Sequence, residues 1–115
     1  MYAHLLKVLS ETFGVTCTSV SAVMMPTIPS GAIKIMLQVE TKDLRVRFFG
    51  TNSGTYAATN GVGGGLHLPL NTINTPFYIF EGWDLINSMC IKGDDGDAKI
   101  NVIYLGYEAE SFNTH

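Results

Sequence analysis

Charged residues are scarce in this chain of 115 residues, because Asp, Glu, Lys and Arg together make up 15% of it, against roughly 25% of an average soluble domain. Hydrophobic residues make up 46%, so the composition predicts that other protein chains cover part of the surface. The net charge is −3, with seven basic residues. A chain with this charge lacks the excess of basic residues that attracts nucleic acid, and we expect no nucleic-acid partner.

Cysteine and long apolar runs are also scarce. Cys17 and Cys90 are the only cysteines, and their separation fits no metal-ligand spacing. Lone thiols in apolar surroundings are typical of buried side chains and favour a reducing compartment. No apolar run approaches the roughly twenty residues of a membrane helix, and the N-terminus shows no signal-peptide pattern. We therefore expect no membrane partner.

Motifs for catalysis and cofactor binding are missing as well. The glycine-rich stretch "ATNGVGGGLHLPL", residues 58–70, lacks the Lys and the Ser or Thr that complete a phosphate loop, and it leads into a strand-like alternation instead of a helix. It predicts a flexible connection. No Gly-x-Ser-x-Gly elbow is present, and His4, His67 and His115 are scattered. We predict no enzyme, no cofactor and no catalytic or metal-ligating residues.

The stretch "KGDDGDAK" is the most chemically suggestive one. Asp94, Asp95 and Asp97 could bring three carboxylates to one hard cation, but the stretch lacks the longer spacing and terminal Glu of an EF-hand. Asp and Gly are also the residues that tight turns select. We predict a turn between a strand that ends at Lys92 and one that starts at Ala98, with a calcium site as the alternative.

Alternating hydrophobicity predicts β-strands in the middle of the chain. In "AIKIMLQVE" and "LRVRFFG" the residues expected to face inward are Ile33, Ile35, Leu37, Val39, Leu44, Val46 and Phe48. Arg45 and Arg47 are expected to face outward. Residues 41–43 read as a short turn, so the two runs are predicted to form a hairpin.

Shorter strands are expected after the glycine-rich loop. Residues 66–70 predict an edge strand because Pro69 interrupts them, and "FYIFEGW", "INSMCIKG" and "DAKINVIYLGY" predict three more. The last is apolar on both faces, so it should lie centrally or under a neighbouring subunit. Residues 1–13 fit a short helix, a strand or an extended arm. Six to eight strands predict one all-β domain over residues 1–115, an antiparallel β-sandwich or jelly-roll-like fold.

Several side chains are candidates for a binding surface. Trp83, with Tyr78, Phe80 and Tyr56, could form an aromatic platform for a sugar, although aromatic residues in all-β chains more often belong to the core or an interface. The outward Arg45 and Arg47 are predicted to be solvated, although beside an acidic neighbouring subunit they could instead make bidentate contacts. The candidate interface residues are Arg45, Arg47, Phe49, Tyr56, His67, Trp83 and Ile103.

The order of segments over about residues 30–106 resembles small virion-associated proteins of tailed bacteriophages. "AIKIMLQVE", "LRVRFFG", the Gly/Thr-rich loop, "LHLPL", an aromatic strand, "WDLINSMCIKG" and "GDAKINVIYLG" follow one another as in those proteins, and residues 84–93 and 98–105 fit best. The N-terminal region departs from the pattern, which puts any docking arm there in doubt.

The resemblance implies a structural protein. It implies a β-sandwich decoration or cement subunit that is made in the bacterial host cytoplasm, binds the major capsid protein on the outside of the capsid and stabilises the shell. A homo-oligomer is expected, with a trimer favoured. A head–tail connector or tail component is the first alternative, and a carbohydrate-binding module is the second.

Overall fold

A computed structural model describes residues 6–50 and 57–107. In this part of the chain, strands alternate along the sequence with loops and with one short helix. The elements are β1 (Leu6–Cys17), β2 (Val23–Met24), β3 (Lys34–Glu40), β4 (Leu44–Arg47), β5 (Leu66–Leu68), β6 (Tyr78–Glu81), α1 (Trp83–Asn87), β7 (Cys90–Gly93) and β8 (Ala98–Tyr107).

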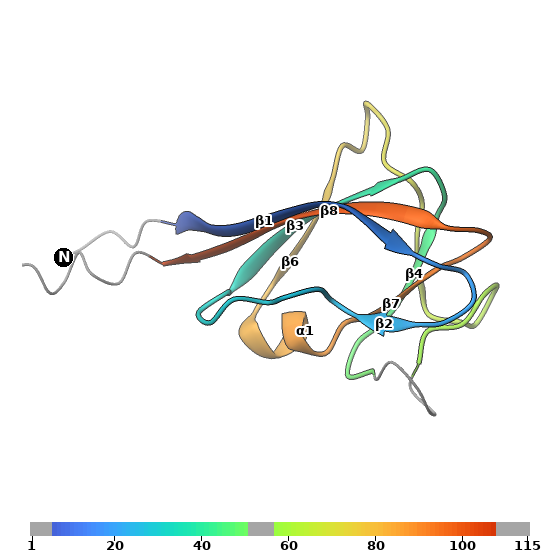
Figure 1. Ribbon diagram of the computed structural model, residues 1–115, viewed down its shortest axis with the longest axis horizontal. Helices are drawn as coiled ribbons and strands as arrows, with labels where there is room; N and C mark the ends of the chain where they lie inside the picture. Colours follow the sequence, from blue (N-terminus) through green and yellow to red (C-terminus); the bar gives the residue numbers. More distant parts are fainter. Residues whose placement is uncertain (1–5, 51–56, 108–115) are drawn as a thin grey trace, which may run out of the picture.

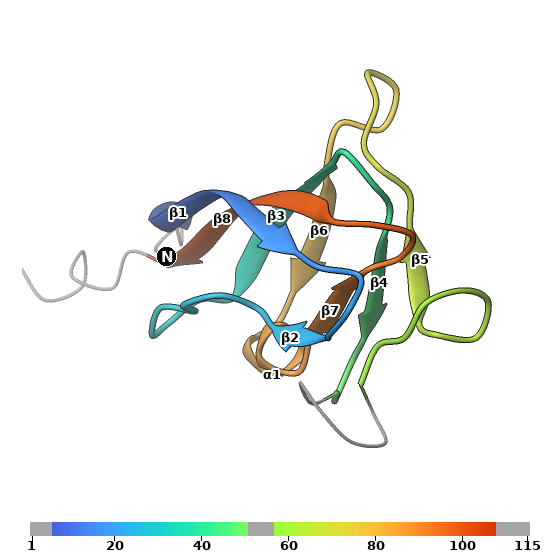
Figure 2. The ribbon, with the colours of Figure 1, turned by 45° about the vertical axis from the view of Figure 1, so that its right-hand side comes forward.

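The strands form two four-stranded sheets (Figures 1 and 2). The order is β1-β8-β3-β6 in sheet A and β2-β7-β4-β5 in sheet B, and every pair is antiparallel. The first strand pairs with the eighth, the second with the seventh, the third with the sixth and the fourth with the fifth. This nested pairing is that of a jelly roll. The predicted all-β sandwich is therefore confirmed.

The predicted hairpin between residues 32–40 and 44–50 is wrong. β3 lies in sheet A between β8 and β6, whereas β4 lies in sheet B between β7 and β5. The chain crosses from one sheet to the other at Thr41, which has a φ of 71°. Alternation correctly identified the inward face of each strand, but it does not say which strand pairs with which. Here both strands find two other partners each.

The core lies between the two sheets. β8 is central in sheet A, as its two apolar faces predicted, and its alternate residues point into the core. β3 and β4 contribute their inward faces to the same core. The side chains with 0% exposure that these three strands contribute are Ile35, Leu37, Val39, Leu44, Ala98, Ile100, Val102 and Tyr104.

The N-terminal segment is a strand, so the helix alternative for residues 1–13 is wrong over residues 6–13, and residues 1–5 lie outside the described residues. β1 runs beside β8 along the sheet (Figure 1). Its register shifts between Val8 and Ser10 and between Thr12 and Val15. At the second shift, Gly14 adopts a φ of 72° and its N–H donates to Asn101 Oδ1 at 2.9 Å. The bulges therefore bend β1 while keeping it within the sheet.

Helix α1 is a feature that hydrophobic periodicity did not predict, because five residues are too few to show a helical period. It joins β6 of sheet A to β7 of sheet B, and its Ile86 is fully buried in the core. No helix in the described ranges is long and apolar enough to cross a membrane.

Candidate functional site

Arg45 is buried, although its position in the alternation predicted an exposed side chain. Its exposed fraction is 8%. The Arg45 Nε atom donates to Asp94 Oδ1 at 2.8 Å, and the Nη1 atom donates to the carbonyl of Gly65 at 3.1 Å. The side chain does point to the outer face of sheet B, but loop 57–65 folds over that face. The sequence could not show this cover, because it depends on tertiary contacts.

Loop 57–65 is closed on itself by backbone hydrogen bonds. The N–H of Thr59 donates to Gly64 at 2.8 Å, and the N–H of Gly64 donates to Gly61 at 3.0 Å. The N–H of Gly61 donates to Asp94 Oδ1 at 2.9 Å. The loop leads into strand β5, as predicted, and not into a helix. The N–H of Gly61 is thus directed at a carboxylate of the same chain.

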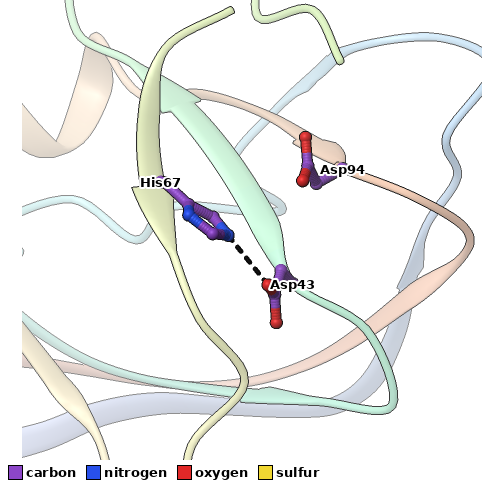
Figure 3. Close-up of side chains that lie close together, drawn as sticks. All are labelled: Asp43, His67 and Asp94. Atoms are coloured by element: carbon purple, nitrogen blue, oxygen red, sulfur yellow. Dashed lines mark hydrogen bonds and ion pairs between the residues drawn. The ribbon is translucent and has the colours of Figure 1, made fainter. Parts of the chain in front are cut away.

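Asp43, His67 and Asp94 come together at the rim of sheet B (Figure 3). Asp43 precedes β4, His67 lies on the edge strand β5, and Asp94 follows β7. His67 Nε2 and Asp43 Oδ2 are 2.8 Å apart. One potential ligand atom from each of the three residues lies within 4.8 Å of the other two. We refer to these three residues as the Asp–His–Asp cluster.

Both carboxylates of the Asp–His–Asp cluster are held ionised by hydrogen bonds. The pKa of Asp43 is lowered chiefly by the N–H of Leu70, which donates to Oδ1 at 2.9 Å, and also by His67. The pKa of Asp94 is lowered chiefly by the N–H of Gly61 and then by the side chain of Arg45. Because hydrogen bonds stabilise the charged form, the cluster keeps two negative charges at neutral pH.

The predicted acidic turn separates its carboxylates. Asp97 Oδ1 accepts a hydrogen bond from the N–H of Ser19 at 3.4 Å, whereas Asp94 turns toward His67. The segment joins β7 of sheet B to β8 of sheet A, so it is a connection between sheets and not a hairpin turn. Within the described residues, the Asp–His–Asp cluster is the group of three side chains that could hold a metal ion. The sequence did not identify Asp43 as part of a site. Asp43 comes close to His67 only because β4 pairs with β5, with Arg45 opposite His67, and this pairing is not visible in the sequence.

The outer face of sheet A carries a second feature, an apolar hollow of about 140 Å³. Its walls are mostly apolar and come from three neighbouring strands and from the residue just before β6. The lining residues are Phe13, Met36, Gln38, Phe77, Asn101 and Ile103. Phe13 remains 60% exposed, and Ile79, which pairs with Met36, is 47% exposed. We refer to these seven residues as the outer apolar face.

The polar side chains in this hollow already have hydrogen-bond partners. Asn101 Nδ2 donates to Gln38 Oε1 and to Glu40 Oε2, both at 2.9 Å, and Gln38 Nε2 donates to the carbonyl of Pro76 at 3.2 Å. Because their polar atoms are used within the chain, the hollow favours an apolar group over a polar one.

The candidate interface residues do not share one surface. Ile103 belongs to the outer apolar face of sheet A, whereas Arg45 and His67 pair on the outer face of sheet B. Phe49 follows β4 with a φ of 56° and is 73% exposed, and Trp83, at the start of α1, is 45% exposed. The half-buried Arg47 ends β4, and Tyr56 lies outside the described residues.

The aromatic residues of β6 face the core instead of joining Trp83 in an exposed platform. Tyr78 and Phe80 both pack against the core cluster. Phe80 contacts Phe48 with ring centroids 5.7 Å apart, and the Tyr78 hydroxyl donates to the carbonyl of Pro69 at 2.5 Å. The structure therefore leaves Trp83 without these two aromatic partners.

Comparisons of the chain with protein-family models, with curated proteins and with solved structures returned no match.

Proposed function

We propose that this protein is a structural subunit that binds the outside of a tailed-bacteriophage capsid and stabilises the shell as a decoration or cement protein. The observation that carries the proposal is the outer apolar face of sheet A. In a sandwich that works alone, the outer face of an antiparallel sheet is normally polar. An apolar outer face indicates that another protein covers it.

The exposed side chains of this face are large enough to contribute to binding. Phe13 is 60% exposed, Ile79 47% and Phe77 39%. Covering a half-exposed side chain of this size contributes roughly 1 kcal/mol, before the costs of association. A single contact of this kind is weak, but many identical copies on a shell add their contributions. This is the physical basis on which a cement subunit acts.

Two further observations support a virion partner. The order of segments over residues 30–106 resembles small phage virion proteins, and the jelly-roll topology is one that viral capsid domains use. Lectin domains use the same topology, and fold alone does not assign function. We propose the major capsid protein as the partner and a homotrimer as the oligomeric state.

Substitutions on the outer apolar face test the proposal. Shells that lack this chain are mixed with purified protein, and bound copies are counted after sedimentation. Ile79→Lys and Phe13→Lys each place a charge on the apolar face and are expected to lower occupancy at least about tenfold, because the charge would be buried on docking.

Val62→Lys and Ile73→Lys are the matched controls. These side chains are 101% and 95% exposed and lie in loops, so both controls should bind shells like the unchanged protein. Normal occupancy by Ile79→Lys would show that the outer apolar face is not the docking surface. Binding to tails or connectors, with none to shells, would favour the alternative location. Binding to glycans that is lost in Trp83→Ala would favour a carbohydrate-binding module.

A further inference from the structure

We propose that Asp43, His67 and Asp94 form a binding site for a divalent cation of the zinc type, one that takes mixed imidazole and carboxylate ligands. This inference is independent of the proposed capsid function. The site is distinct from the predicted acidic turn, because it shares only Asp94 with it and takes its other two donors from β5 and from the residue before β4.

The spacing of the donors fits a small cation. Three atoms within 4.8 Å of one another have a common centre no more than roughly 2.8 Å from each, and zinc binds imidazole nitrogen and carboxylate oxygen at about 2.0–2.2 Å. A contraction of less than about 1 Å therefore brings all three donors into zinc's range. The donors come from three segments that are far apart in the sequence (Figure 3).

The carboxylates are oriented from outside the cluster. The N–H of Leu70 holds Asp43 Oδ1, and the N–H of Gly61 and the guanidinium of Arg45 both hold Asp94 Oδ1. Such outer hydrogen bonds fix ligating groups in known metal sites. Asp94 Oδ2 accepts no hydrogen bond from the described part of the chain and is open to solvent, because every buried side-chain nitrogen or oxygen atom there has a partner. This carboxylate therefore keeps an oxygen available for a cation.

The local charge also favours a cation. Asp43 and Asp94 are both ionised, and Arg45 compensates one of these charges while also donating to Gly65. A bound cation would compensate the remaining negative charge. When a cation binds, the imidazole must present an unprotonated nitrogen to it, so the proton shared with Asp43 moves to the other ring nitrogen or to solvent.

The presence of an imidazole selects among cations. Ca²⁺ and Mg²⁺ prefer oxygen ligands alone, whereas imidazole suits Zn²⁺ and its neighbours. Three protein ligands at a partly exposed position leave room for water on the metal. A bound zinc ion would link the edge strand β5 to the start of β4 and to the connection after β7, which stabilises the exposed edge of sheet B.

Calorimetric titration of the full chain with Zn²⁺, under reducing conditions at neutral pH, tests the site. The unchanged protein should bind one ion, and His67→Gln should weaken binding at least about tenfold. His4→Gln and His115→Gln remove the other two histidines, and Asp97→Asn removes a nearby carboxylate, so these controls should bind as the unchanged protein does. A far-ultraviolet circular dichroism spectrum confirms that each variant is folded.

A two-dimensional NMR spectrum of the backbone amides locates the ion. The amide signals of Gly61 and Leu70 should shift on addition of Zn²⁺, since these groups donate to the two carboxylates. Zinc binding that is unchanged in His67→Gln, or that leaves both signals in place, would overturn the proposal. So would the absence of binding to the unchanged protein, or equally strong binding of Ca²⁺ that His67→Gln does not affect.

Discussion

At the scale of single residues, the polar side chains of sheet B are more ordered than their positions in the sequence indicate. The alternation of residues 44–48 correctly predicted that Leu44 and Val46 face the core, where their exposed fractions are 0% and 1%. It also predicted that Arg45 faces outward, which is right, and that it is solvated, which is wrong. The covering loop approaches from elsewhere in the chain, so no local pattern could reveal it. Likewise, the local sequence predicts only a turn at Asp43, because His67 and Leu70, which contact its carboxylate, are distant in the sequence.

Replacing Arg45 should destabilise the fold. Arg45→Ala leaves the Asp94 carboxylate, which is 15% exposed, without its charged partner, and the carbonyl of Gly65 without its donor. We expect the free energy of unfolding to fall by about 2–4 kcal/mol, measured by urea unfolding. Asp95→Ala, at an exposed position next to Asp94, should change the free energy of unfolding by less than about 0.5 kcal/mol. An unfolding midpoint for Arg45→Ala equal to that of the unchanged protein would refute the structural role of Arg45.

A buried thiol and a buried phenol, which both lose a proton at high pH, should make the stability of the fold sensitive to alkali. Burial raises the pKa of Cys17 to about 12 and that of Tyr104 to about 12, from ordinary values of about 8.5 and 10. Because the folded protein holds these protons more tightly than the unfolded chain, their contribution to stability is complete below about pH 8.5 and is lost as the pH rises toward 12.

Urea unfolding between pH 7 and pH 11, with a reducing agent present, measures this dependence. We expect the free energy of unfolding to fall above about pH 8.5. In Cys17→Ala the fall should begin later, near the ordinary pKa of tyrosine. A free energy that stays constant up to pH 11 in the unchanged protein would contradict this account.

At the scale of elements, the strands themselves were predictable and their pairing was not. Alternation correctly identified β3, β4 and β8, and the proline at position 69 correctly placed β5 at an edge of its sheet. The connection at residues 41–43 has the length of a hairpin turn, yet it crosses between sheets. β3 and β4 each pair with two strands that are distant in the sequence, and such long-range pairing leaves no local signal. The five residues of α1 were too few to show a helical period.

The end of β7 leaves no room for a side chain at Gly93. A Cβ atom at Gly93 would lie 2.2 Å from the carbonyl oxygen of Gly96 and 2.6 Å from that of Cys17. Both are backbone atoms, so they cannot rotate away. Gly93→Ala should therefore lower the free energy of unfolding by about 1–3 kcal/mol, whereas Lys92→Ala in the same strand should change it by less than about 0.5 kcal/mol. Urea unfolding of the two variants measures the difference, and equal stabilities would contradict the packing described here.

At the scale of the whole molecule, the two sheets differ in what they present. The outer face of sheet B is covered by loop 57–65 and carries charged groups that bond to one another. The outer face of sheet A has an apolar hollow whose polar atoms are already satisfied. The sequence predicted the outward Ile103 as an interface residue, because alternation reveals the side on which a residue lies. It could not identify a partner that would cover this face, since an interface depends on two chains.

The copy number of this chain in virus particles tests the central claim most directly. Virus particles from cultures in which the chain is produced are purified and treated with nuclease, and quantitative mass spectrometry measures the ratio of this chain to the major shell protein. The account predicts a ratio of the same order as the shell protein, because a cement subunit repeats over the whole capsid lattice. A ratio many times lower would move the chain to the connector or tail, and its absence from the particles would contradict the account outright.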